Sequence, residues 1–135
     1  MSEFKLQIVT PDGLLYDGNA DKIIVRTTEG DVGILARHSD YVAPLSIGVA
    51  RIFTKEGERK AACSGGMITV SDGVVRVVAE TFEWSEDIDV NRALKAKEKA
   101  QNALENTKRS DYDHRLAEAK LKRSLARLSA SGRKE

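Results

Sequence analysis

The hydrophobic pattern of the chain changes once, across residues 85–93, and this change limits the folds that the sequence can adopt. Before it, Val and Gly are frequent and apolar residues often recur at every second position. After it, Ala, Leu, Lys and Arg dominate, and apolar residues lie three or four positions apart. A period of two is typical of strands, and a period of about 3.6 is typical of helices. We therefore predict an α+β fold, with a β domain over residues 1–84 and a helical domain over residues 85–135.

Eight segments of the first part are predicted strands. They are residues 4–8, 14–16, 22–27, 32–35, 45–53, 59–63, 67–70 and 74–80. Turn residues separate several of them, among them Pro11-Asp12-Gly13 and the hairpin dipeptide Asp72-Gly73. Many short strands joined by such turns are typical of a sandwich or barrel rather than of alternating strands and helices. We expect an N-terminal antiparallel β-sandwich.

Two amphipathic helices are predicted in the second part. The first has an apolar stripe that begins at Val90 and is mostly Ala. The stripe of the second helix consists of Ala117, Leu121, Leu125 and Leu128. We expect Asp89 to be the N-cap of the first helix, because an N-cap carboxylate accepts a hydrogen bond from a free N–H group of the first turn. The residue types and spacing of Ser110 and Asp113 are close to those of a capping box before the second helix. The short connection predicts a C-terminal antiparallel two-helix hairpin.

The two parts carry opposite charges, although the formal net charge of the whole chain is +1. Residues 1–87 hold 9 Lys and Arg against 14 Asp and Glu, whereas residues 88–135 hold 13 against 7. We expect the two parts to meet different surfaces or to attract each other. The single cysteine, Cys63, cannot form an internal disulfide, and no apolar run approaches the roughly 20 residues of a membrane span. The expectation is a cytosolic chain that reaches a membrane only through a partner.

The predicted hairpin gathers basic side chains near the boundary. Folding back brings Arg92 and Lys99 of the first helix towards Arg123 and Arg127 of the second. Like charges repel unless an anion lies among them, and guanidinium groups suit a triphosphate. The Ala-rich stripe buries little apolar surface, so opening the hairpin should require little free energy. The alternative interpretation is that these residues are solvated helix faces.

Five groups of residues along nearly the whole chain form a recognisable series. They are Val9-Thr10-Pro11-Asp12-Gly13, Glu29-Gly30-Asp31-Val32-Gly33-Ile34-Leu35, His38, Ser64-Gly65-Gly66 and Asp87-Ile88-Asp89-Val90-Asn91-Arg92-Ala93. In this order and spacing they resemble the epsilon subunits of bacterial F-type ATP synthases. The sequence departs from that family at Ala36-Arg37, where a Pro followed by a small or polar residue is usual.

The resemblance implies a non-catalytic rotor subunit in the central stalk of a proton-translocating ATP synthase. Such a subunit is bound to the gamma subunit and rests on the ring of c subunits, at the cytoplasmic face of the bacterial membrane. By this resemblance, the loop of Glu29, Gly30 and Asp31 faces the c-ring, and His38 lies near gamma and the ring. Acidic side chains that meet basic loops would help to set the register of the contact. The alternative for this loop is a plain turn.

The resemblance also implies that the helices regulate the enzyme. Extended along gamma into the catalytic head, they would block ATP hydrolysis through basic residues that face the alpha and beta subunits. These residues are Arg115, Lys120, Lys122, Arg123 and Arg127.

In bacillus-like members of the family, the folded hairpin binds ATP, so we expect ATP, alone or with magnesium, as a regulatory ligand of this chain. The matching residues are Ile88, Asp89, Arg92 and Ala93, supported by Glu83, Arg123 and Arg127. Lys99 stands where the family has an Arg, which keeps the positive charge but loses the bidentate hydrogen bonding of a guanidinium group. The implied mechanism is a switch that ATP holds closed.

Other classes of function have weaker sequence support. His38-Ser39-Asp40 contains the residue types of a hydrolytic triad, but adjacent residues cannot easily adopt that geometry, so we expect no enzyme activity of the chain alone. His38, Cys63 and His114 are too scattered for zinc, and we expect no metal site and no required cofactor. The alternative function is a β-domain adaptor whose basic hairpin binds nucleic acid or another acidic partner. Because Tyr112 is the sole aromatic residue of the second part, we expect no nucleic-acid binding.

Overall fold

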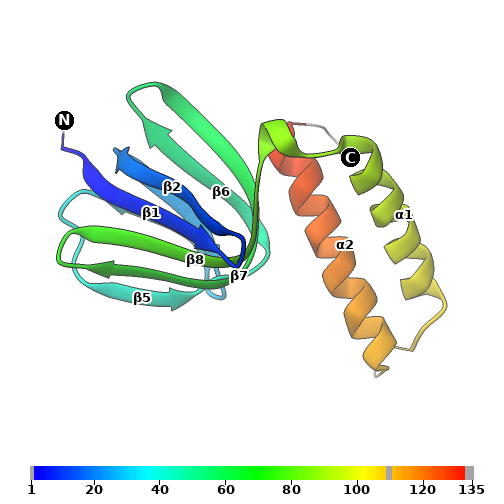
Figure 1. The fold of residues 1–135 in the computed structure, drawn as a ribbon. Coiled ribbons are helices and arrows are strands. Elements are labelled where there is room, and N and C mark those ends of the chain that lie inside the picture. Colours follow the sequence, from blue (N-terminus) through cyan, green and yellow to red (C-terminus); the bar gives the residue numbers. More distant parts are fainter. Residues whose placement is uncertain (1, 109–110, 133–135) are drawn as a thin grey trace.

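The computed structural model describes residues 2–108 and 111–132, which form a β-sandwich followed by two helices (Figure 1). The strands are β1 Phe4–Thr10, β2 Gly13–Ala20, β3 Lys22–Thr27, β4 Gly30–Leu35, β5 Tyr41–Pro44, β6 Gly48–Thr54, β7 Gly57–Ser71 and β8 Val74–Trp84. A short 3-10 turn, η1 Ser85–Asp87, leads into α1 Val90–Glu105 and α2 Tyr112–Ala130. The predicted α+β fold with a C-terminal helical hairpin is confirmed.

Alternating burial explains how the strands build the sandwich. In β1 the side chains of Phe4, Leu6 and Ile8 are buried, whereas Lys5 is exposed. The strands follow the order β2-β1-β8-β7-β6-β3-β4, and β5 pairs with β7. Inward side chains from all eight strands meet in one apolar core. Burial of one face of each strand is the main source of stability of such a sheet.

One strand pair differs from the antiparallel expectation. β1 and β8 run parallel, with Leu6 opposite Val75, and every other strand pair of the sheet is antiparallel within the described residues. Turn residues and local alternation identify strands but do not give the relative direction of two strands that are distant in sequence. The sheet is therefore mixed.

Two predicted strands, residues 59–63 and 67–70, are parts of the single strand β7, which passes through the glycine pair 65–66. Both glycines have positive φ, 68° at Gly65 and 101° at Gly66. A Cβ atom at Gly66 would lie 1.8 Å from the carbonyl oxygen of Val78 in β8. Glycine is needed here because β8 passes so closely, not because the chain turns.

The stretch before β6 was also predicted incompletely. β6 begins at Gly48 rather than at residue 45, and the four-residue strand β5, Tyr41–Pro44, was not predicted. β5 ends in a proline and pairs only with β7 among the described strands. Proline weakens a strand prediction because it cannot donate to a ladder, but it is tolerated on an edge strand.

The hairpin folds back against the sandwich, with α2 between α1 and the strands (Figure 1). Ala126 and Ala130 of α2 form an apolar cluster with Ala62 of β7 and with Ile88. Ile47 and Val49 pack against this cluster. Small side chains allow the helix to approach the sheet closely, which places the positive face of α2 beside the end of β8.

Helix capping agrees with the prediction at α1. The Oδ1 atom of Asp89 accepts a hydrogen bond of 3.0 Å from the backbone N–H of Arg92. At α2 the N-cap is Asp111. The capping box predicted before this helix depends on Ser110, which lies outside the described residues. In the described part of the chain, neither helix is both long and apolar enough to cross a membrane.

Candidate functional site

A cavity of about 380 Å³ opens at the junction between the sandwich and α1. It is lined by Glu83, Asp87, Asp89, Arg92, Ala93, Ala96 and Arg127. We call it the joint cavity. The N-cap bond of Asp89 fixes the first turn of α1, and the end of β8 supplies Glu83. Carboxylates and guanidinium groups from three parts of the chain therefore converge on one hollow.

A second cavity of about 640 Å³ lies between the two helices, and we call it the interhelical groove. α1 contributes Ala96, Ala100 and Ala103 to its lining, and the charged residues of the lining are Lys99, Asp113, Lys120, Arg123 and Arg127. Ala96 and Arg127 line both cavities, so the two adjoin each other. The short Ala side chains leave this space open, and the basic residues make it suitable for an anion.

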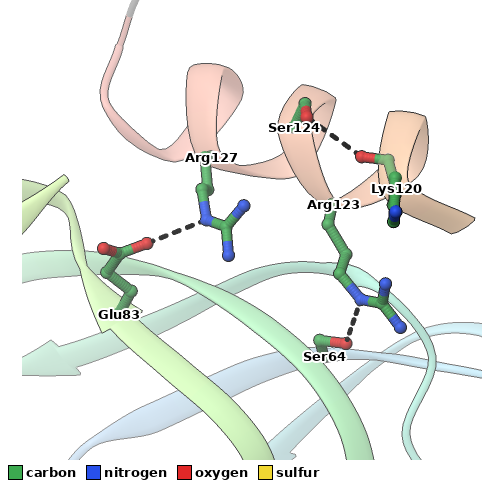
Figure 2. Close-up of polar contacts among 6 residues, drawn as sticks. All are labelled: Ser64, Glu83, Lys120, Arg123, Ser124 and Arg127. Atoms are coloured by element: carbon green, nitrogen blue, oxygen red, sulfur yellow. Dashed lines mark hydrogen bonds and ion pairs between the residues drawn. The ribbon is translucent and has the colours of Figure 1, made fainter. Parts of the chain in front are cut away.

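Two polar contacts connect the arginines of α2 to the sandwich (Figure 2). The Nε atom of Arg127 donates to Glu83 Oε1 at 3.0 Å, and the Nε atom of Arg123 donates to Ser64 Oγ at 3.4 Å. Ser64 is buried, and sequence analysis did not assign it a role at this site. Its place in β7 opposite α2 depends on the tertiary fold, and no local sequence signal indicates it.

Of the eight residues that sequence analysis assigned to ATP, all but Ile88 line this continuous space. Glu83, Asp89, Arg92, Ala93 and Arg127 line the joint cavity. Lys99 and Arg123 line the interhelical groove, together with Arg127. Ile88 is buried in the cluster that α2 forms with the sandwich. Folding thus brings together residues that are up to 44 positions apart in the sequence.

The five basic residues assigned to the inhibitory contact are divided between faces of α2. Lys120, Arg123 and Arg127 line the interhelical groove. Lys122 lines a separate groove, formed between α2 and the strands β3, β4 and β6. The guanidinium group of Arg115 lies 6.0 Å from the ring centroid of Tyr112. In the folded hairpin, therefore, these residues do not form one common basic surface.

The loop assigned to the c-ring is a tight turn between β3 and β4. The backbone N–H of Glu29 donates to Thr27 Oγ1 at 3.2 Å, and the Thr27 hydroxyl donates to the Gly30 carbonyl at 2.8 Å. Gly30 has a φ of 114°, which favours glycine. Asp31 forms an ion pair of 3.1 Å with Arg26, so of the two carboxylates Glu29 is the one without a recorded ion pair among the described residues.

His38 lies in the loop that follows β4, apart from both cavities. Its Nδ1 atom is 2.7 Å from the carbonyl oxygen of Ser39. A carbonyl oxygen can only accept, so Nδ1 carries the proton in this contact. The ring meets that of Tyr41 edge-on, with 5.6 Å between the centroids. These contacts give the ring a defined orientation at the start of β5.

The turn η1 at the joint is attached to the sandwich by Arg59 of β7. The guanidinium of this residue lies over Trp84, 3.6 Å from the ring centroid, and donates to Glu86 Oε1 at 2.7 Å. The hydrogen bond from Arg59 holds the pKa of the exposed Glu86 carboxyl below its ordinary value. We call Arg59, Trp84 and Glu86 the joint clasp. It fixes the direction in which the chain leaves β8 towards Asp89.

Cys63 and the possible metal ligands are the remaining candidates for chemistry. Cys63 is buried, and this burial raises the pKa of its thiol to about 12, so the thiol is protonated near neutral pH. Across residues 2–108 and 111–132, no group of three or more His, Cys, Asp or Glu residues is placed to hold a metal ion.

Comparison with known proteins identifies the family. Residues 3–85 match the family described as ATP synthase, Delta/Epsilon chain, beta-sandwich domain. Residues 86–132 match the family described as ATP synthase, Delta/Epsilon chain, long alpha-helix domain.

Individual relatives agree over the full length. The ATP synthase epsilon chain of Alkalihalophilus pseudofirmus is 43% identical over 133 residues, which span 98% of this chain and 100% of that protein. The epsilon chain of Bacillus velezensis is also 43% identical over 133 residues, covering 98% of this chain and 99% of that protein. A chain in the OSCP/F1/c-ring structure of the Euglena gracilis mitochondrial ATP synthase aligns with a TM-score of 0.83 and 26% identity, covering 97% of this chain and 82% of that chain.

The nucleic-acid-binding adaptor gains no support from these matches, whereas both parts of the chain match the same family in the same order. The chain therefore belongs to the ATP synthase delta/epsilon chain family, and within it to the epsilon chains.

Proposed function

We infer that this chain is the non-catalytic epsilon subunit of an F-type ATP synthase and is part of its rotating central stalk. The observation that carries this inference is the full-length match to epsilon chains, together with the fold shared with a chain of an F1/c-ring assembly. The inferred role is to couple the gamma subunit to the c-ring. The chain would lie at the cytoplasmic face of the bacterial membrane and be held there by the complex. Co-purification with the other subunits tests this assignment.

The turn of Glu29, Gly30 and Asp31 is proposed as the c-ring contact, and His38 as a residue near gamma and the ring. The exposed carboxylate of Glu29 is available for a basic partner loop, whereas Asp31 is already paired with Arg26. Glu29 would therefore contribute more to this contact than Asp31. Because exposed ion pairs are weak individually, the contact would set register rather than supply most of the affinity.

ATP is proposed to bind the folded hairpin and to hold it closed. The joint cavity carries three carboxylates, whose oxygens can accept hydrogen bonds from amino and hydroxyl donors of a nucleoside. The interhelical groove carries four basic residues and one carboxylate, which favours the phosphates. In this arrangement the base and ribose lie near Asp89, and the phosphates extend between the helices.

In the proposed switch, the same basic residues have different partners in the closed and in the extended hairpin. Arg123 and Arg127 would bind phosphates in the closed hairpin and would face the catalytic subunits in the extended one. A ligand that binds only the closed state shifts the equilibrium towards it. High ATP would thus relieve inhibition of ATP hydrolysis, and low ATP would permit it.

Calorimetric titration of ATP into the full chain tests the nucleotide site. Arg92→Ala is expected to weaken binding by about tenfold or more, as the loss of a charged hydrogen bond usually does. Asp89→Asn keeps the capping oxygen but removes the charge, so it separates the ligand contact from helix capping. Lys95→Ala, an exposed change on α1 outside both cavities, is the matched control. Absence of saturable binding by the folded wild-type chain would contradict the ATP switch and leave the stalk assignment intact.

A further inference from the structure

Lys120 shares the groove-facing side of α2 with the two arginines assigned to ATP. Positions i, i+3 and i+7 of a helix lie on one face, and Lys120, Arg123 and Arg127 have this spacing. All three line the interhelical groove. Figure 2 shows them on successive turns of α2. Lys122 lies on another side of the helix and lines a different groove.

The basic residues form two levels along the antiparallel helices. Arg92 of α1 and Arg127 of α2 both line the joint cavity. Seven residues further from the joint on each helix, Lys99 and Lys120 both line the interhelical groove. Seven residues correspond to a rise of about 10 Å along a helix. Arg123 lies between the two levels, so the cations form a path that leads away from the joint.

Within the described part of the chain, no ion pair neutralises the positive charge at the far level. Among the described residues, Arg127 pairs with Glu83, but no ion pair is recorded for Lys99, Lys120 or Arg123. Asp113 is the one carboxylate that the described lining of the interhelical groove includes. Cations that gather without anions repel one another, and this repulsion is relieved when a multiply charged anion binds.

We propose that Lys120 is a further nucleotide-binding residue, which contacts the terminal phosphate of ATP in the closed hairpin. The proposal rests on the proposed function, because it places the nucleoside at the joint cavity and the phosphates along the groove. Of the α2 cations that line the groove, Lys120 is the one furthest from the joint in sequence. With Lys99 opposite, it supplies the charge that distinguishes a triphosphate from a monophosphate. The same residue would contact the catalytic subunits only after the hairpin opens.

The test compares Lys120→Ala with Lys122→Ala in calorimetric titrations of ATP, ADP and AMP into the full chain. Both side chains are exposed, lie on the same helix and lose the same charge, so the variants are matched in fold and net charge. We expect Lys120→Ala to weaken ATP binding by about tenfold, the usual effect of losing a charged hydrogen bond. AMP affinity should be unchanged, so the preference for ATP over AMP falls by the same factor. Lys122→Ala should bind all three nucleotides as the wild type does.

Two outcomes overturn the proposal in distinguishable ways. If wild-type chain binds ATP but the two variants weaken it equally, or if Lys120→Ala weakens AMP as much as ATP, Lys120 has no specific phosphate contact. The ATP site itself then still stands. If the folded wild-type chain binds no nucleotide, the ATP switch fails and this proposal fails with it. Far-UV circular dichroism of each variant confirms that the folds being compared are intact.

Discussion

At the scale of single residues, the joint clasp shows how one side chain connects two parts of the chain. Arg59 comes from the middle of the sandwich sequence, yet it stacks on Trp84 and pairs with Glu86 of η1. Trp84 also meets Phe82 edge-on at 5.1 Å between centroids. The clasp therefore joins the aromatic edge of the core to the segment that starts the helices. Because the sequence contains one Trp, its fluorescence reports on this position alone.

We predict a titration of Trp84 fluorescence below pH 4.5, the ordinary pKa of a Glu carboxyl. The hydrogen bond from Arg59 lowers the pKa of Glu86, so the clasp is intact above the ordinary pKa and is lost as the pH falls through the lowered folded value. Fluorescence measured from pH 7 to 2 should change with its midpoint below 4.5. Glu86→Gln should abolish that step, and an identical titration in Glu86→Gln would contradict the assignment.

At the scale of elements, the N-terminus of α1 combines a helix cap with part of the lining of the joint cavity. Asp89 caps the helix and also lines the joint cavity. The first turn of α1 is without acidic residues of its own, so the Asp89 cap supplies most of the negative charge that offsets the positive end of the helix dipole. Any test of the nucleotide site at Asp89 must therefore separate helix stability from ligand contact.

Asp89→Ala is predicted to lower the free energy of unfolding by about 1 kcal/mol, the usual cost of losing an N-cap. Asp89→Asn should recover most of this loss, because its side-chain oxygen can still accept from the Arg92 N–H. Urea unfolding followed by far-UV circular dichroism measures both. Equal stability of Asp89→Ala and the wild type would show that the cap contributes little to the fold.

At the scale of the whole molecule, the hairpin packs on the sandwich through a small apolar contact. Ala126 and Ala130 of α2 meet Ala62 and Ile88, whereas the sandwich has its own larger core. An interface made mostly of Ala contributes less free energy than one made of Leu. Because the sandwich has a core of its own, it would remain folded if the hairpin left it, as the proposed switch requires.

We predict that Ala126→Glu releases the hairpin without unfolding the sandwich. The larger, charged side chain would have to fit where the small Ala126 side chain packs in the apolar cluster, and its burial costs several kcal/mol unless the helix moves away. Trypsin should then cleave the Lys- and Arg-rich helices faster and leave a resistant sandwich fragment. Ser129→Glu, which adds the same charge at an exposed position of α2, is the control. Loss of the sheet signal in circular dichroism, or unchanged cleavage, would contradict independent release.

Several residues of the site could be predicted from local sequence, whereas others could not. The capping role of Asp89 was predictable because neighbouring residues determine an N-cap. The grouping of Lys120 with Arg123 and Arg127 could also have been found from their spacing on one helix face. Ser64 and Arg59 could not, since each comes from β7 and reaches its partner only through the packing of distant segments.

The sequence by itself determined the two-part organisation, the helical hairpin, the cap of α1 and the family, because periodicity, turn chemistry and motif order are local properties of the chain. The tertiary structure decided the parallel pairing of β1 with β8, the unbroken path of β7 through Gly65 and Gly66, and the division of the α2 cations between two grooves. These features depend on contacts between segments far apart in sequence. Such contacts are selected by the shared burial of apolar surface, which no short stretch of sequence specifies alone.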